Sequence, residues 1–116
     1  MSTKPSTIAY LEDQLGKVSG ISTRAMFGEY ALYCDGRVVA LICDDQLFVK
    51  ITEPGKAFVG EYYQEGEAYP GAKPSMLIDE ERIEDREWLA KLIQITAENV
   101  PLPKPKAKKK KRIEKG

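Results

Sequence analysis

Three apolar alternations follow one another between residues 22 and 51, and they constrain the fold more than any other stretch of the chain. Turn residues separate them at Cys34-Asp35-Gly36-Arg37 and at Asp44-Asp45. Alternation with period two is typical of strands that bury one face, and Asp-Gly is a strong signal for a two-residue hairpin. The pattern therefore predicts a compact antiparallel meander.

The same signals place the individual strands and one loop. The meander strands are expected at Thr23–Phe27, Tyr30–Cys34, Val38–Cys43 and Leu47–Ile51, and an edge strand is expected at Ser75–Ile78. Gly28 falls between the first two strands and marks a bulge or a tight turn. The segment Gln64–Pro74 holds two glycines and two prolines, which predicts a loop or at most a distorted edge strand.

Apolar side chains that recur every three to four residues predict helices at Pro5–Lys17 and Asp79–Val100. Thr52 as a cap and Pro54 in the first turn predict a short helix at Glu53–Glu61. Acidic residues crowd the start of the last helix, which begins at Asp79 or at Glu84, and they suit the positive end of the helix dipole. Trp88 is expected to anchor this helix to the sheet, so that Trp88→Ala would cost about 3–5 kcal/mol. The predicted fold is a two-layer α+β domain with helices on one face of an antiparallel β-meander sheet.

Charge is unevenly distributed along the chain, although the formal net charge is zero. Residues 1–100 hold ten basic and 17 acidic residues, whereas residues 101–116 hold eight basic residues and one acid, a net charge of +7. The length of 116 residues suits one domain, which we place at residues 1–100. Residues 101–116 consist mainly of lysine and proline and are predicted to form a disordered basic tail.

Catalytic chemistry is disfavoured by the residues present. The chain has no histidine, the commonest general base and metal ligand, and Cys34 and Cys43 match no zinc-binding spacing. Both cysteines are expected to be reduced, semi-buried apolar residues. Glu29, Asp44 and Asp45 offer oxygen ligands for a metal, but adjacent aspartates in a turn are usually turn residues. We expect no catalytic residue, metal or cofactor.

The location of the protein follows from two observations. No apolar run approaches the roughly 18 residues that a membrane span needs, so we expect no membrane association. The first six residues, Met-Ser-Thr-Lys-Pro-Ser, lack the apolar stretch of a secretory signal. A cytoplasmic protein is therefore expected.

Several short motifs occur in the order found in one known family. They are Arg24-Ala-Met26-Phe27-Gly28, the Asp35-Gly36 hairpin, Asp45-Gln46-Leu47-Phe48-Val49-Lys50, and later Tyr69, Ser75-Met76 and the Trp88 helix. Together they resemble the N-terminal domain of the TfoX (Sxy) family, whose pattern is an R-x-M-F-G turn, a D-G hairpin and a D-x-L-Y/F-x-K strand. The resemblance covers roughly Ile8 to Val100, the whole expected domain.

The resemblance implies a two-layer α+β fold and regulatory work rather than catalysis. The namesake proteins switch on competence genes together with a cyclic-AMP-responsive transcription factor, so a protein partner, such as a transcription factor, is implied. Those proteins carry a second, helical domain after this one, and here a lysine-rich segment stands in its place. We therefore expect a stand-alone N-terminal domain of this family.

Arg24 is the candidate contact residue within the domain. As a surface arginine beside a tight turn it would contact a protein partner or a phosphate. As a structural residue, which we favour, it would pair with an acid such as Glu29. An exposed edge strand also leaves self-pairing, and hence a dimer, open.

The basic tail is the candidate nucleic-acid contact, through Lys104, Lys106, Lys108, Lys109, Lys110, Lys111 and Arg112. Closely spaced lysines neutralise phosphates without reading sequence. Two functions are thus left open. The preferred one is a non-enzymatic regulatory domain that acts through a protein partner. The alternative is a nucleic-acid-binding accessory protein that uses its tail.

Overall fold

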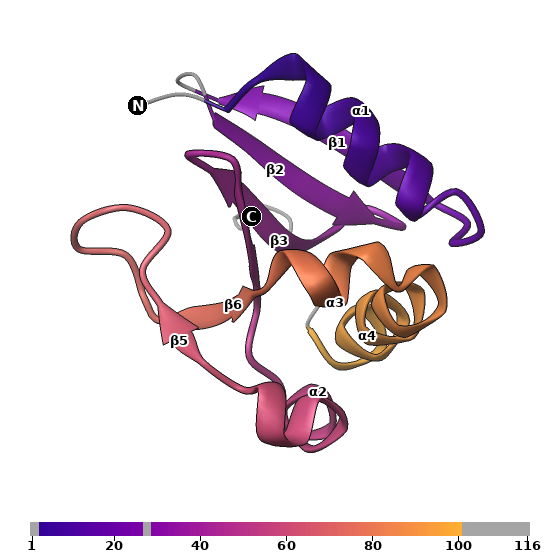
Figure 1. Ribbon diagram of the computed structural model, residues 1–116, viewed down its shortest axis with the longest axis vertical. Helices are drawn as coiled ribbons and strands as arrows, with labels where there is room; N and C mark the ends of the chain where they lie inside the picture. Colours follow the sequence, from indigo (N-terminus) through magenta and orange to yellow (C-terminus); the bar gives the residue numbers. More distant parts are fainter. Residues whose placement is uncertain (1–2, 27–28, 101–116) are drawn as a thin grey trace, which may run out of the picture.

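The computed structural model describes residues 3–26 and 29–100, which form one six-stranded antiparallel sheet with helices packed against it (Figure 1). The strand order across the sheet is β1-β2-β3-β4-β6-β5. The strands are β1 (Ile21–Met26), β2 (Glu29–Cys34), β3 (Arg37–Cys43), β4 (Gln46–Val49), β5 (Glu65–Gly66) and β6 (Ser75–Ile78). The helices are α1 (Pro5–Gln14), α2 (Glu53–Val59), α3 (Glu80–Glu84) and α4 (Arg86–Asn99), and Gly60–Tyr62 forms a 3-10 turn. The predicted α+β class is confirmed.

Two tight turns build the centre of the sheet. Asp35 and Gly36 join β2 to β3 with φ of 53° and 81°, and Asp44 and Asp45 join β3 to β4 with φ of 53° and 62°. Two successive residues with positive φ are the mark of a turn that matches the twist of antiparallel strands. Aspartate tolerates this region better than most side chains because it is short and polar. Both turns predicted from the sequence are therefore confirmed.

The sequence placed the outer strands less well. β4 ends at Val49 rather than at Ile51: the Lys50 N–H still donates to the Val39 carbonyl oxygen at 2.9 Å, but two residues later Thr52 caps α2. β6, expected at an edge of the sheet, lies between β4 and the two-residue strand β5. The loop predicted at Gln64–Pro74 is present, and only its first residues pair as a strand. Gly28 lies outside the described residues.

The predicted C-terminal helix is two helices. Asp85 interrupts it with extended backbone (φ −84°, ψ 93°), and its carboxylate accepts a hydrogen bond from the Trp88 backbone N–H at 3.1 Å. This is the geometry of a residue that caps a helix start, which suits aspartate. α3 therefore ends at Glu84, and α4 begins as a separate helix at Arg86. The first helix likewise ends at Gln14, three residues earlier than expected.

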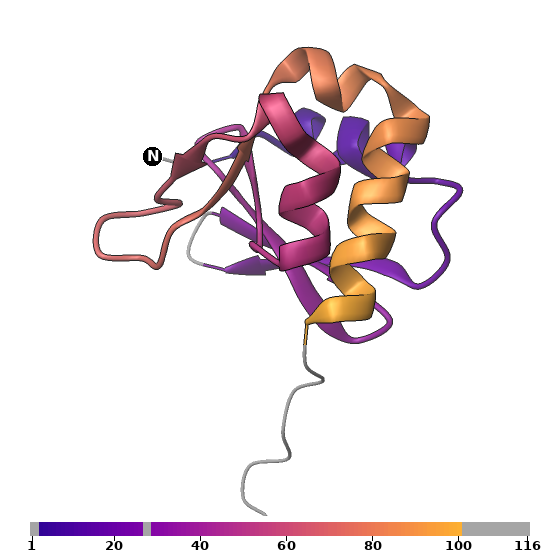
Figure 2. The ribbon, with the colours of Figure 1, turned by 90° about the horizontal axis from the view of Figure 1, so that it is seen from below.

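The core lies between the helices and one face of the sheet. Its largest fully buried apolar side chains are Leu15, Leu32, Val39, Ile42, Leu47, Val49, Met76, Leu89, Leu92 and Ile93. α2 and α4 lie side by side (Figure 2), and at Gly55 an added Cβ would lie 2.7 Å from Thr52 Oγ1 and 3.6 Å from Leu92 Cδ1. Glycine is thus required there by the lack of space.

Trp88 does not anchor α4 to the sheet, and that prediction is wrong. Its ring is half-buried at the edge of the core, with its centroid 5.4 Å from the Phe58 ring and 6.3 Å from the Tyr62 ring. The residues of α4 that are buried are Leu89, Leu92, Ile93, Thr96 and Ala97. The buried stripe of the helix is rotated away from Trp88, so the tryptophan covers α2 instead.

Candidate functional site

Five strands hold a row of side chains in register on the face of the sheet that carries no helix. The row consists of Arg24, Ala31, Leu41, Phe48 and Leu77. The adjacent row, Leu32, Ala40, Val49 and Met76, belongs to the core beneath the helices. Because successive residues of a strand point to opposite faces, the first row points away from the core.

We call this surface the open face. It comprises the first row, the neighbouring residues that alternate in phase with it, and the loop of residues 67–74. The phased neighbours are Met26, Glu29, Tyr33, Cys43, Gln46 and Lys50. In Figure 1 the loop projects from β5 and β6 at the left, away from α4.

The loop covers part of the open face and leaves hollows beside it. β5 passes close above Phe48, since a Cβ added at Gly66 would lie 3.2 Å from Phe48 Cε2. Within the described residues, hollows of about 550, 500 and 460 Å³ adjoin the loop, and Tyr69 lines all three. Their floor is apolar, with Leu41, Cys43 and Phe48 each lining two of them. The concave and largely apolar character of this region is typical of a binding surface.

Two large apolar side chains stand exposed around these hollows. Tyr69 is 57% exposed and Met26 is 38% exposed. A single exposed apolar residue is ordinary, but apolar side chains that border a shared apolar hollow mark a contact surface. Covering them would contribute about 25 cal/mol for each Å² of apolar area removed from water. Sequence patterns did not reveal this surface, because Tyr69 stands in a Gly- and Pro-rich loop without periodicity.

Arg24 lies on the open face, as the functional interpretation requires. Its guanidinium carbon is 5.7 Å from the centre of the Tyr33 ring, a cation–π arrangement on the neighbouring strand. The expected pairing with Glu29 is wrong. The Glu29 carboxylate instead accepts hydrogen bonds from Thr3 Oγ1 at 2.6 Å and from the Asp44 N–H at 3.1 Å.

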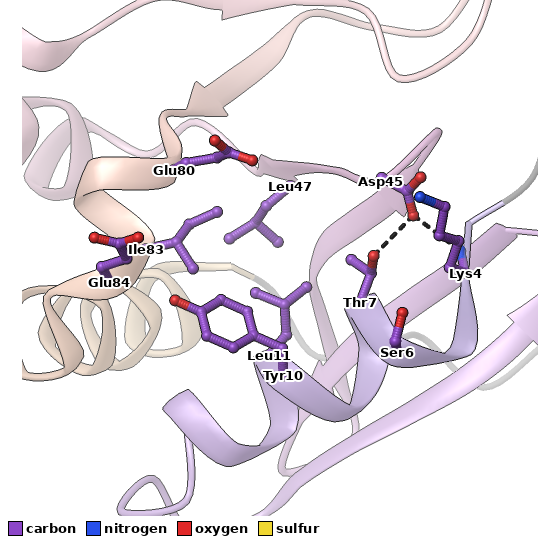
Figure 3. Close-up of a pocket in the computed structure, with 10 residues that line it drawn as sticks. All are labelled: Lys4, Ser6, Thr7, Tyr10, Leu11, Asp45, Leu47, Glu80, Ile83 and Glu84. Carbon is purple, nitrogen blue, oxygen red and sulfur yellow. Dashed lines mark hydrogen bonds between the residues drawn. The ribbon is translucent and has the colours of Figure 1, made fainter.

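A separate hollow of about 460 Å³ lies between α1, α3 and the start of β4 (Figure 3). At one end Asp45 accepts hydrogen bonds from the Lys4 N–H at 2.9 Å and from Thr7 Oγ1 at 2.8 Å, and these bonds lower the pKa of its carboxyl. At the other end partial desolvation raises the pKa of the Tyr10 phenol, and the carboxylates of Glu84 and Glu80 raise it further. A phenol held protonated is a poor general base.

No catalytic constellation emerges from the described residues. Asp44 and Asp45, considered as metal ligands, form the tight turn and hold the start of α1. In residues 3–26 and 29–100, no three Cys, Asp or Glu side chains gather closely enough to hold a metal ion. Nor does any helix among those residues combine the length and apolarity needed to cross a membrane.

The two cysteines are free and buried, as predicted. The Cys34 thiol lies 3.6 Å from the Ser19 carbonyl oxygen, and burial raises its pKa, with Asp35 raising it further. Burial also raises the pKa of Cys43, and Glu29 adds to this effect. Since the thiolate is the reactive form, the raised pKa values lower the reactivity expected of both residues.

The remaining predicted site residues, Lys104 to Arg112, lie outside the described residues.

Two comparisons place the chain among known proteins. The fold defines a small two-layer α+β domain. The model of the TfoX N-terminal domain family matches residues 13–100, so the chain belongs to this family. An uncharacterized 12.7 kDa protein from the trpE 5′ region of Spirochaeta aurantia is 38% identical over 111 residues, covering 96% of this chain and 95% of that protein. The predicted resemblance is confirmed, and family membership supports a regulatory domain.

Proposed function

We propose that the chain is a non-enzymatic regulatory domain that acts by binding a protein through its open face. The observation that carries this proposal is the exposed apolar pair Met26 and Tyr69 beside hollows floored by Leu41, Cys43 and Phe48. Removing water from such an apolar surface costs little free energy when a protein covers it. The resemblance to proteins that switch on competence genes makes a transcription factor the expected kind of partner.

A complementation experiment tests this role. Transcript levels are compared in the parent strain, in a strain that lacks the gene, and in strains that carry Tyr69→Ala or Tyr10→Ala instead. Both tyrosines are exposed, at 57% and 44%, but only Tyr69 lies on the open face. We expect the deletion to shift a defined set of transcripts, Tyr10→Ala to restore them, and Tyr69→Ala to leave them shifted. Full restoration by Tyr69→Ala, or no shift on deletion, would overturn the proposal.

The basic tail supports a second candidate function, the binding of nucleic acid. Residues 101–116 carry a net charge of +7, which suits the phosphate backbone. If about six phosphates are engaged on duplex DNA, log K falls with log salt with a slope near −5. Fluorescence anisotropy of labelled DNA and RNA, with the full chain and with a chain that ends at Val100, measures this. Equal binding by both chains, or no binding near physiological salt, would contradict it.

A further inference from the structure

We propose that the open face binds a second copy of this chain in a two-fold arrangement, with the acidic end of each face against the basic end of the other. The inference rests on the proposed function in one respect: it takes the open face as a protein-binding surface, and it places a second copy of this chain there in place of a transcription factor. Three observations carry it: the charge distribution, the shape of the face and the position of Tyr69.

Charge is separated along the open face. The hollow at one end is lined by Glu29, Asp44 and Glu67. The hollow at the other end is lined by Lys50 and Lys73. Asp44 precedes β4 and Lys50 follows it, so the two charge clusters lie at opposite ends of one strand. The face is thus bipolar, with Phe48 and Tyr69 bordering both hollows.

A bipolar face is complementary to itself. When two identical faces meet about a two-fold axis that lies in the interface and runs across the direction of charge separation, each end of one lies over the opposite end of the other. Both acidic clusters then face basic clusters, and the apolar centres coincide. Complementary potentials steer association and select against other partners. A partner of uniform charge would gain at one end of the face and lose at the other.

The shape of the open face favours the same arrangement. The loop of residues 67–74 covers part of the open face and presents Tyr69 to solvent. Between Tyr69 and Met26 lies the hollow of about 460 Å³, whose other walls include Tyr30, Leu41 and Cys43. A tyrosine combines a large apolar ring with a polar tip, which suits a hollow that is apolar with one carboxylate, Glu29, at its rim. Each Tyr69 is therefore placed to fill the hollow of the partner copy.

Two other occupants fit less well. The tail of this chain, with a net charge of +7, would meet Arg24, Lys50 and Lys73 on the same face. Pairing along the free edge of β1 would bring a second chain against α1, whose Glu12 accepts a hydrogen bond from Thr23 at 2.9 Å. The face, rather than the edge or the tail, is the favoured contact.

Charge-reversal variants of the full chain test the arrangement. Sedimentation velocity over a concentration series measures self-association of the native chain, Glu67→Lys, Lys73→Glu and the double variant. In the dimer of each single variant, the substituted end of each copy faces an end of like charge on the other copy. We therefore expect the dissociation constant of the dimer to rise at least about tenfold. In an equimolar mixture of the two single variants both contacts become complementary, and association returns. The double variant restores the pairing within one chain and dimerises by itself.

Matched controls separate this contact from a general effect of charge. Glu98→Lys and Lys91→Glu reverse exposed charges on α4, away from the open face, and are expected to leave self-association unchanged. Tyr69→Ala is expected to abolish the dimer, whereas Tyr10→Ala keeps it. A native chain that stays monomeric at high concentration overturns the inference. So does a dimer that the two open-face reversals do not weaken, or a mixture that fails to recover.

The two proposals fail separately. Sedimentation detects self-association alone, whereas the transcript experiment detects any partner that needs Tyr69. A monomeric native chain with a Tyr69-dependent transcript response would overturn the dimer and leave the proposed function standing. A dimer that responds to the charge reversals as expected, without any transcript response, would support the dimer and overturn the proposed function.

Discussion

The carboxylate of Asp45 accepts a hydrogen bond from the side-chain hydroxyl of Thr7 at 2.8 Å, and so joins the turn between β3 and β4 to the start of α1. The same carboxylate oxygen accepts the N–H of Lys4 at 2.9 Å. Lys4 precedes the helix, and its own side chain caps nothing. Asp45 thus caps α1 from across the fold, and it does so from a left-handed backbone conformation with φ of 62°.

Replacing Asp45 is expected to loosen α1 from the sheet. Asp45→Asn keeps an oxygen acceptor and tolerates positive φ, whereas Asp45→Ala loses both advantages. We expect the melting temperature to fall in the order native, Asn, Ala. Thermal unfolding followed by circular dichroism measures this order. A melting temperature of the alanine variant equal to that of the native chain would contradict the capping role.

The contribution of the Asp45 charge also depends on pH. Its hydrogen bonds lower its pKa in the folded state, so the stabilisation is fully present above the unfolded pKa and is lost as pH falls through the folded value. The advantage of the native chain over Asp45→Asn should therefore shrink between about pH 5 and pH 2. Urea unfolding at several pH values checks this. An advantage that stays constant down to the acid limit would exclude the charge as its source.

The packing of α4 predicts unequal costs for two large-to-small substitutions. Leu92 is fully buried, so Leu92→Ala should lower the free energy of unfolding by about 3 kcal/mol. Trp88 is only half-buried beside Phe58 and Tyr62, so Trp88→Ala should cost less, about 2 kcal/mol. Urea unfolding followed by circular dichroism measures both. A larger cost for Trp88 would place it in the core after all.

Gln14 is a buried polar residue that joins α1 to α3 and α4. Its amide nitrogen donates to the carbonyl oxygens of Ile83 at 2.8 Å and Glu84 at 3.2 Å, and its oxygen accepts from Arg86 Nε at 3.0 Å. Gln14→Leu removes all three bonds and leaves buried acceptors unpaired, which should cost about 1–3 kcal/mol. Gln94→Leu, on the exposed face of α4, is the matched control and should change little. Equal free energies of unfolding for Gln14→Leu and Gln94→Leu would contradict the structural role of Gln14.

The cysteines should react only when the chain unfolds. Burial raises the pKa of both thiols, so little thiolate forms near neutral pH, and the sulfurs are shielded from reagent. With Ellman's reagent we expect the native chain to release thionitrobenzoate slowly, and the chain in denaturant to release two equivalents rapidly. Rapid reaction of one thiol in the native chain would show that Cys43 is accessible from the open face.

The sequence predicted the meander because its signals are local. Asp35-Gly36 and the alternation on either side determine a hairpin whatever the rest of the chain does. The helix break at Asp85 was harder to predict, since an aspartate within an acidic run reads equally as a helix start or as a first-turn residue. Trp88 was misplaced because it lies next to the apolar stripe and was taken as part of it, whereas the buried residues of α4 are Leu89, Leu92, Ile93, Thr96 and Ala97.

The candidate site was mostly beyond the reach of sequence patterns. Arg24 was identified from a motif, but its neighbour is Tyr33 on the next strand, and the cross-strand register decides that contact. Tyr69 joins the hollows only because β5 and β6 pair and carry the loop over Phe48. Gln14 looked like an ordinary polar helix residue, since its partners are about seventy residues away. Such long-range relationships leave no periodic trace.

One measurement tests the role of the open face most directly. The chain is labelled with ¹³C at its methionine methyl groups, and the spectrum is recorded over a dilution series. Met26 is 38% exposed on the open face, whereas Met76 lies in the core with 0% exposure and serves as the internal control. The account predicts that the Met26 resonance moves with concentration while that of Met76 stays fixed. A Met26 resonance that does not change with concentration would contradict self-association through the open face.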